Sequence, residues 1–273
     1  MRLSTVRIYP VKSTRGSELP AADVEPWGLR GDRRWLVVDA TGTHLAAPVN
    51  DRMLTVAATP TPDGGLTLTA PGYEPITVPR PEPDAEPLPD PFGHVERCLS
   101  GGKAADAWLS EVLGQPVRLG WQDDPRRRTV QTRHGGRPGD VLSLADTGPL
   151  LLTGTASLEQ LNEWVAATRA DRGEPDEPLA MARFRPNVVV DGAEPFAEDG
   201  WAHVTIGSVP FRVSERCNRC VLTTIDPDTQ ARGKEPIRTL SRYRRAEGKV
   251  WFGVRLVPLG TGTIRVGDEI TVG

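Results

Sequence analysis

Two of the three cysteines in this 273-residue chain lie in the stretch Cys217-Asn218-Arg219-Cys220-Val221-Leu222-Thr223-Thr224-Ile225-Asp226-Pro227-Asp228-Thr229. The thiols are spaced C-x-x-C, and Arg216 and Arg219 stand beside them. Neighbouring cations favour the thiolate, which is the form of cysteine that attacks electrophiles and binds soft metals. The stretch is therefore the strongest candidate in the sequence for a site of chemistry.

A C-x-x-C pair alone is compatible with three structures. It could be half of a zinc site, but such sites usually have four ligands, and the remaining candidates form no second close pair. Those candidates are Cys98, His44, His94, His134 and His203. It could be a thioredoxin-like redox pair, although that motif lies at a turn from strand to helix, whereas residues 221–225 predict a β-strand. The third possibility is two small thiols packed in a core.

The composition limits the classes of protein to which the chain can belong. Its formal net charge is −3, which argues against a general nucleic-acid binder. No apolar run reaches about 18 residues, so we expect no transmembrane helix. Strand-like residues 3–9 open the chain, so we expect no signal peptide. Three cysteines are too few for a disulfide framework, and we expect a reducing, cytoplasmic compartment.

The N-terminal part of the chain predicts mostly β-structure. The expected strands are residues 34–39, 54–58 and 66–69. The step Asp63-Gly64 predicts a hairpin between the last two strands. Residues Pro81–Pro91 include five prolines and four acids, and because proline removes donors and acids resist burial, they predict an extended, solvated linker. We place a domain boundary here, between residues 1–90 and 91–273.

Three helices are expected in the rest of the chain. The first spans residues 104–113 and ends at Gly114, a residue type that favours helix C-termini. The second has Ser157 as its N-cap with Gln160 completing a capping box, and the third starts at Pro236. The other expected elements are strands at residues 184–190, 203–206, 209–213, 221–225, 251–257, 263–266 and 269–272.

A polar segment with several arginines lies between the first two helices, at residues 123–139. Its arginines are Arg126, Arg127, Arg128, Arg133 and Arg137. The segment is interpreted first as a mobile surface loop, and the functional alternative is a basic rim over an anionic ligand.

Seven short segments, spread from residue 9 to residue 268, together form a pattern that is more specific than any one of them. They are Tyr9-Pro10-Val11-Lys12-Ser13, Gly31-Asp32-Arg33-Arg34-Trp35-Leu36-Val37, Asp146-Thr147-Gly148-Pro149, Ala156-Ser157-Leu158, Arg183-Phe184-Arg185-Pro186-Asn187, the cysteine stretch, and Gly262-Thr263-Ile264-Arg265-Val266-Gly267-Asp268. With these segments the chain resembles the MOSC family, the molybdenum-cofactor sulfurase C-terminal domain, over residues 9–268. The resemblance is strongest to the branch with its own N-terminal β-barrel domain, which includes the amidoxime-reducing proteins.

The resemblance implies a mainly β fold with a few helices (α+β). It implies two β-barrel-like domains, which are a MOSC N-terminal domain and a MOSC domain. It also implies a molybdenum cofactor, a pterin that carries a phosphate and a dithiolene holding the metal. The family's protein ligand to molybdenum is the second cysteine of the motif, which is Cys220 here, and a thiolate is a matching ligand for soft molybdenum. Cys217 would then have a supporting or structural role and would not bind the metal itself.

The resemblance also assigns residues to the organic part of the cofactor. The phosphate needs fixed cations and donors, and the matching positions are Lys12, Ser13, Arg33 and Arg185. Further positions that approach the cofactor are Asn218, Arg219 and Thr147. Asp226 is either a proton relay near Cys220 or a turn residue before Pro227, and the sequence does not separate the two roles.

By this resemblance the chain is expected to be an enzyme that reduces N-hydroxylated or N-oxide compounds. Two departures bear on its substrate preference, because Arg255 stands where amidoxime-reducing proteins carry a tyrosine and Gln230 where a glycine is usual. The cysteines leave no set for an iron–sulfur centre, so electrons are expected from a separate electron-transfer protein and its reductase. Two alternatives remain, a non-enzymatic cofactor carrier and a cysteine-persulfide sulfur-transfer protein.

Overall fold

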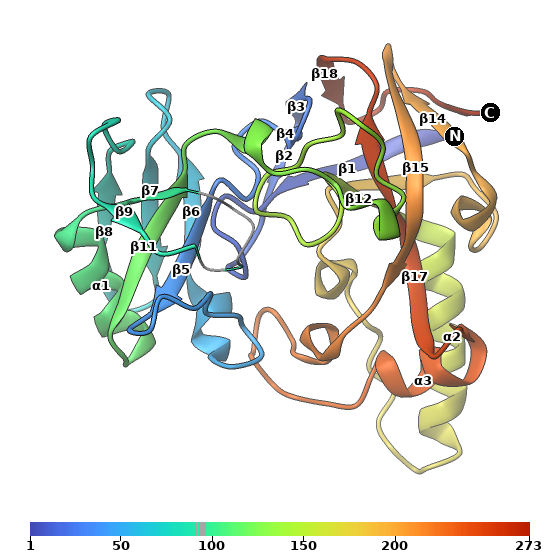
Figure 1. Cartoon of the computed structure of the whole chain (residues 1–273). Helices are drawn as coiled ribbons and strands as arrows, with labels where there is room; N and C mark the ends of the chain where they lie inside the picture. The colour runs from blue at the N-terminus through green and yellow to red at the C-terminus, as the bar shows by residue number, and fades with distance from the viewer. Residues whose placement is uncertain (91, 93–96) are drawn as a thin grey trace.

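The computed structural model describes residues 1–90, 92 and 97–273. Figure 1 shows two lobes side by side, one built around β5, β7 and β11 with α1, the other around β12, β15 and β17 with α2 and α3. The three α-helices of the described chain are α1 (Lys103–Leu113), α2 (Thr155–Ala170) and α3 (Ile237–Tyr243). Strands outnumber them throughout, so the expected mainly β class with a few helices is confirmed.

The second lobe contains a nine-stranded sheet in the order β19-β14-β15-β17-β12-β13-β1-β2, with β16 paired to β17. Its strands are β1 (Arg2–Ile8), β2 (Ser17–Leu19), β12 (Leu150–Gly154), β13 (Val188–Asp191), β14 (His203–Ile206), β15 (Val209–Asn218), β16 (Arg245–Ala246), β17 (Lys249–Pro258) and β19 (Ile270–Val272). All pairs in the main path are antiparallel except β12 with β13.

The remaining strands form three smaller sheets. The first has the order β5 (Trp35–Asp39), β11 (Val117–Gln122), β10 (Cys98–Ser100), β9 (Pro87–Leu88). The second is β6 (Ala57–Pro60), β7 (Leu66–Ala70), β8 (Tyr73–Val78), and the third is β18 (Gly262–Arg265), β3 (Ala21–Glu25), β4 (Gly28–Leu29). Among the described strands these pairings run as open paths, so neither lobe is a closed barrel.

Each lobe has its own hydrophobic core. In the first lobe Trp35, Met53 and Leu68 pack against Leu109 of α1. In the second, the inner faces of β1, β12, β15 and β17 bury leucine, valine and phenylalanine side chains, and a smaller cluster lies beneath α2. Ile225 follows the cysteine motif in the chain but is buried in the core of the first lobe. The motif therefore lies where the lobes meet.

The N-terminal segment contributes to both lobes. β1 lies between β13 and β2 in the nine-stranded sheet, and β3 pairs with β18 near the other end of the chain. Strands β9 to β11 pair with β5, and α1 packs on the same core. A boundary between residues 90 and 91 stays a prediction, and strand pairings cross that position in both directions.

Most expected elements are present, and their signals were local. The Asp63-Gly64 turn joins β6 to β7, α1 ends at Gly114 in the left-handed conformation, and α3 follows Pro236. None of the helices within the described ranges is both long and apolar enough to cross a bilayer.

One expected strand is absent and another starts late, in both cases because side chains bond to nearby backbone. Residues 221–225 were predicted as a strand, but Val221–Thr224 forms the 3₁₀ turn η6, in which Thr223 and Thr224 hydroxyls donate to carbonyls three residues earlier. Residues 54–58 begin instead in the 3₁₀ turn η1 (Asp51–Thr55), which Asn50 caps, and only β6 is extended.

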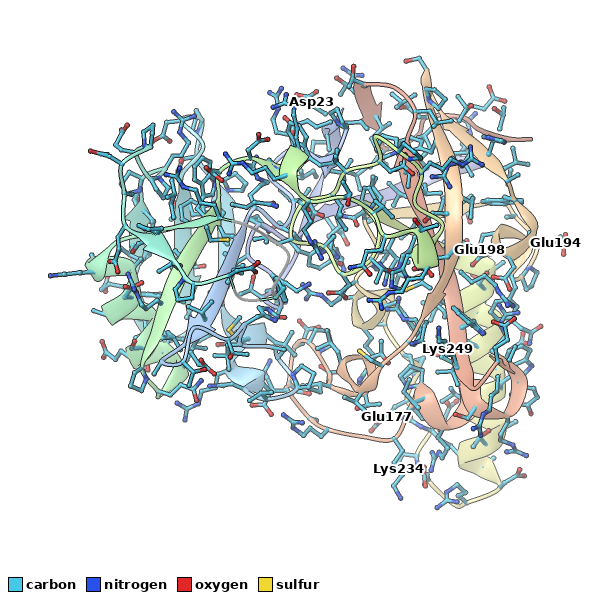
Figure 2. The ribbon with its side chains drawn as sticks, viewed as in Figure 1. Asp23, Glu177, Glu194, Glu198, Lys234 and Lys249 are labelled. Carbon is cyan, nitrogen blue, oxygen red and sulfur yellow. The ribbon has the colours of Figure 1, made fainter. Side chains whose placement is uncertain are left out.

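Two further element limits differ from the prediction. The strand expected from residue 184 begins only at Val188, because the 3₁₀ turn η4 (Met181–Phe184) and left-handed Arg185 precede it. Helix α2 is capped by Gly154 instead of Ser157. The buried Ser157 hydroxyl donates to Glu198 Oε2 over 2.8 Å and accepts from the Phe196 amide. Figure 2 labels Glu198 within the second lobe, where this hydrogen bond ties α2 to the following loop.

Candidate functional site

The largest collection of expected site residues lies around one pocket, called here the main pocket. It encloses about 660 Å³ of space free of protein atoms, including its open mouth. Seven of the nine residues predicted from the sequence line it, namely Lys12, Ser13, Arg33, Arg185, Asn218, Arg219 and Cys220. The two that do not are Thr147 and Asp226.

The main pocket is formed where six chain segments meet. These are the turn after β1, the turn before β5, the segment 145–151 that leads into β12, the η4 turn, the end of β15 with the cysteine motif, and β17 at Arg255. Backbone hydrogen bonds join the first two, since the Lys12 amide donates to Trp35 O and the Trp35 amide donates to Pro10 O. Residues far apart in sequence are thereby held at one wall.

Three of the expected phosphate-binding residues have left-handed backbone. The φ angles are 67° at Ser13, 47° at Arg33 and 56° at Arg185. This region is uncommon for residues with a Cβ and costs about 1–3 kcal/mol at each position, so it persists where the surroundings enforce it. The Arg33 amide donates to Tyr9 O and the Arg185 amide to Ala182 O, which helps to fix both turns. Such strain is concentrated at functional sites.

Two arginines share one aromatic ring at the closed end of the pocket. Arg33 and Arg185 lie 4.6 and 4.2 Å from the centroid of the buried Tyr9 ring. Arg33 is paired with Asp32 at 2.6 Å and donates to Asn187 Oδ1 at 2.9 Å. Arg185 donates to the Thr14 carbonyl at 2.6 Å, and burial lowers the pKa of its guanidinium to about 10. No carboxylate within the described residues pairs with Arg185, so its charge is left for a ligand.

Lys12 is buried between the side chains of both lobes. Its Nζ donates to Leu144 O at 2.9 Å and forms a salt bridge with Asp146 Oδ1. Burial lowers the pKa of Lys12, while the Asp146 carboxylate opposes that shift. The cations Lys12, Arg255 and Arg33 hold the pKa of Asp146 well below its usual range. The lining contains six cationic side chains and this one carboxylate, which suits an anionic ligand.

The two motif cysteines have different environments. Cys217 is buried, and Arg219 Nη1 donates to its Sγ at 2.9 Å, while another nitrogen of the same guanidinium donates to Phe184 O. Cys220 is exposed at the start of η6 and lines the main pocket. The third cysteine, Cys98, is buried in the first lobe, and burial raises the pKa of its thiol to about 12. Cys220 is thus the thiol placed to meet a ligand.

The metal alternatives raised by the sequence have no support in the described residues. Within the described ranges no three or more His, Cys, Asp or Glu side chains lie close enough together to hold a metal ion. His94 lies outside the described residues. A zinc site would need such a group, so the C-x-x-C pair is not half of one formed by the described chain.

Thr147 and Asp226 lie beside the main pocket. Thr147 lines an adjoining cavity of about 560 Å³, called here the side pocket, which shares Lys12 and Asp146 with the main pocket. Asp226 Oδ1 accepts from the amides of Asp228 and Thr229, and Oδ2 accepts from Arg183 at 2.7 Å. These are the contacts of a turn residue. Through Arg183 the turn is also joined to the pocket wall.

Three further residues belong to the site. Asn187 Oδ1 accepts from Arg33 and from the Leu151 amide, and its Nδ2 donates to Arg7 O. Arg183 and Asp146 also line the main pocket. All three residues lie inside the segments that carried the family resemblance. Their position beside the predicted site residues of those segments could have identified them from the sequence.

Comparison with known proteins agrees with this arrangement. The profile described as the MOSC N-terminal beta barrel domain matches residues 1–116, and that of the MOSC domain matches residues 132–271. The chain is 33% identical to the mitochondrial amidoxime-reducing component 1 of Homo sapiens over 96% of this chain and 80% of that protein. It is 31% identical to the protein of the same name from Xenopus laevis, over 98% of this chain and 81% of that one.

A second group of relatives is longer. The chain is 35% identical to the molybdenum cofactor sulfurase of Danio rerio, over 93% of this chain and 31% of that protein. It therefore spans about a third of the length of such sulfurases. Matches to both family profiles and to near-full-length relatives show that this chain belongs to the MOSC family, in the branch with a MOSC N-terminal β-barrel domain.

Proposed function

We propose that the protein is a molybdenum-cofactor-dependent reductase of N-hydroxylated or N-oxide compounds. The observation that carries the proposal is the main pocket, where the exposed Cys220 thiol shares one cavity with six cationic side chains, of which Arg185 and Arg219 pair with no carboxylate among the described residues. The names of the amidoxime-reducing relatives support this reaction class, and the name of the sulfurase relatives supports the cofactor.

The residues present fit the cofactor. A pterin phosphate needs several converging donors, and the unpaired Arg185 beside Arg33, Lys12 and Ser13 supplies them. Two buried guanidinium nitrogens in the same wall, Nε of Arg183 and of Arg219, have no hydrogen-bond partner in the described chain. Buried donors left unpaired are costly, so they are expected where a ligand accepts from them.

Each residue then has a role. Lys12, Ser13, Arg33 and Arg185 would bind the phosphate, and Asn218, Arg219 and Thr147 would position the rest of the pterin. Cys220 would be the ligand to the metal, and Cys217 would fix the backbone of the motif. When bound, the cofactor supplies two-electron redox chemistry at the metal, while the protein binds, orients and shields it. The contacts of Asp226 favour a supporting role through Arg183.

Electrons would come from a separate electron-transfer protein and its reductase. In the arginine-rich segment 123–139, Arg128 is buried and donates to carbonyls of the 143–146 loop, so it stabilises that loop. Arg126, Arg127, Arg133 and Arg137 are exposed. An acidic redox protein could dock on these four cations, since complementary charge steers such encounters. We propose a cytoplasmic location for this system.

The proposal is tested with protein made in a host that synthesises the cofactor. Molybdenum and pterin are measured per mole of protein, and turnover of a model amidoxime is measured with an artificial reductant. We expect about one cofactor per chain and formation of the amidine. Retained cofactor without turnover would instead indicate a carrier, and cyanide-labile sulfur without retained metal would indicate persulfide sulfur transfer at Cys220.

A further inference from the structure

A chain of polar side chains at the edge of the site includes His134 and Glu215, which have no role in the proposed cofactor binding. His134 Nδ1 lies 3.1 Å from Glu215 Oε2, and the Thr147 hydroxyl donates to Oε1 of the same carboxylate over 2.7 Å. Arg133 Nε donates to His134 Nε2 over 3.3 Å, which places the proton of a neutral imidazole on Nδ1. Polar groups therefore connect the exposed Arg133 with Thr147 in the side pocket.

The backbone at His134 is fixed by close packing. His134 ends the 3₁₀ turn η3 (Thr132–His134), and Gly135 follows with φ 71°. A Cβ on Gly135 would lie 2.1 Å from Ser214 O, and one on Gly136 would lie 1.9 Å from another backbone carbonyl. Arg212 Nη1 donates to Gly135 O over 3.0 Å. Only a glycine at position 135 allows the turn to lie this close to β15, and this contact holds the imidazole against Glu215.

The pair lies between solvent and the main pocket. The His134 and Glu215 side chains are each 22% exposed, so water reaches both. His134 and Thr147 line the side pocket, whose Lys12 and Asp146 also line the main pocket. On the other side, Arg255 Nε lies 3.4 Å from Glu215 Oε1 and belongs to the main-pocket wall.

The proposed reaction consumes protons. Reduction of R–NH–OH by two electrons and two protons breaks the N–O bond, forms an N–H bond and releases water. The separate redox protein supplies the electrons, so the protons must come from solvent through the protein. His44 has a pKa lowered to about 4 by burial and by Lys12, and His203 lies exposed on β14. Among the described histidines, His134 alone lines either pocket.

We propose that His134 and Glu215 form the pair that carries protons from solvent to the site, an inference that rests on the proposed function. The imidazole takes a proton at Nε2 and passes the Nδ1 proton to Glu215 Oε2. The other carboxylate oxygen faces the Thr147 hydroxyl, which is the last group of the chain on the pocket side. The charged groups around the pair are Arg133, Arg128, Arg255, Lys12 and Asp146.

The first test is His134→Gln, which keeps a polar side chain but cannot titrate. With holoprotein and saturating artificial reductant, kcat should fall about tenfold or more, since a positioned acid or base contributes a factor of that size or larger. KM and the molybdenum and pterin content should stay unchanged. In the parent protein we expect kcat to fall at high pH, and in His134→Gln we expect this fall to be absent. His203→Gln is the control and should leave both the rate and the pH profile unaltered.

The second test moves the titration without removing the imidazole. Glu215→Gln removes a negative charge that favours imidazolium, so the His134 ring, followed by NMR, should titrate at lower pH than in the parent protein. The high-pH limb of kcat should move by the same amount. Arg133→Gln removes a cation and should move both in the opposite direction, which keeps the test decisive if the Glu215 variant binds cofactor poorly.

Two results would overturn the inference while leaving the proposed function intact. One is a parent enzyme that turns over an amidoxime together with a His134→Gln variant of equal kcat and identical pH profile. The other is an NMR titration that shifts in the Arg133 or Glu215 variant while the rate profile stays in place. Absence of turnover in the parent protein, by contrast, would count against the proposed function itself.

Discussion

Arg219 Nη1 donates to Cys217 Sγ over 2.9 Å, so the first cysteine of the motif is held inside the protein while Cys220 faces the main pocket. We expect Cys220→Ser to lose molybdenum and activity, because a serine hydroxyl is a poor ligand for a soft metal. Cys217→Ser should keep a substantial share of both. Metal and pterin content per protein, measured beside turnover, separate the two variants.

Cys98→Ser is the matched control, since Cys98 lies in the core of the first lobe and lines neither pocket. It should alter stability only. Equal metal loss in the Cys217 and Cys220 variants would contradict the assignment and point back to a pair of thiols acting together.

The cations at the closed end of the pocket should decide how tightly the pterin is held. Replacing Lys12, Arg33 or Arg185 singly by glutamine removes one charge-assisted hydrogen bond to the phosphate. Such a bond contributes about 1.5–3 kcal/mol, so retention should weaken by roughly tenfold or more. Pterin per protein after extensive dialysis measures this directly.

Arg30→Gln is a control for the loss of positive charge. Arg30 is 69% exposed and pairs with Asp23 and Glu25 on β3, away from the pocket; Figure 2 labels Asp23 at the rim of the molecule. Its replacement should leave pterin content unchanged. Unchanged occupancy in all three pocket variants would show that the anion binds elsewhere.

Acidification should destabilise the protein through His44. Burial and the nearby Lys12 lower the pKa of this imidazole to about 4, and its Nε2 is buried without a partner. The folded state therefore binds fewer protons than the unfolded chain between pH 6.5 and about 4, and stability falls as the pH drops through that window. Between pH 7 and pH 5, the free energy of unfolding of His44→Phe should fall by about 1–2 kcal/mol less than that of the parent protein.

Denaturant unfolding of both proteins at pH 7 and pH 5, analysed with one common dependence of the free energy of unfolding on denaturant, measures the difference between parent and variant. All other titrating groups are common to both proteins and cancel in the comparison. Identical losses in parent and variant would mean that His44 is protonated in the folded state at pH 5.

Reduction should require a protein partner and should depend on salt. No Gly-x-Gly-x-x-Gly follows a strand in the sequence, so we expect no turnover with NADH alone. Adding a flavin reductase and a small acidic electron carrier should restore it. Arg126→Glu and Arg137→Glu should slow the carrier-dependent rate several-fold at low ionic strength, and the difference should shrink as salt rises.

Lys234→Glu is the control for this surface, because Figure 2 places Lys234 at the opposite edge from the arginine loop. It should leave the rate with the carrier unchanged. Robust turnover with NADH alone would reveal an internal redox site, and equal slowing by all three variants would indicate a general effect of net charge.

The sequence predicted elements best where the signal was local. The Asp63-Gly64 hairpin, the end of α1 at Gly114 and the start of α3 at Pro236 each depend on the preference of one or two residues for a backbone conformation. The threonines of η6 caused the wrong prediction of a strand at residues 221–225. Their β-branched side chains favour strands, but their hydroxyls bond to the backbone of the turn.

The site was predictable as a set of residues and unpredictable as a geometry. The family resemblance predicted that Lys12, Arg33 and Arg185 belong to one site. No local sequence preference predicts the left-handed backbone found at Arg33 and Arg185. The link from His134 to Glu215 spans 81 positions and depends on Gly135 packing against β15. Contacts of that kind are set by tertiary packing, which a single sequence does not display.

The pairing of β1 with β13 has a consequence for synthesis on the ribosome. Leu3 and Val6 of β1 are buried against partners near Val190, so the first strand emerges long before its neighbour exists. Until then the nascent chain presents an apolar strand that has β2 on one edge and no partner on the other, the kind of edge that aggregates or recruits chaperones. The wall that Lys12 contributes to the pocket can form only when most of the chain has been translated, so the proposed cofactor would be loaded after translation.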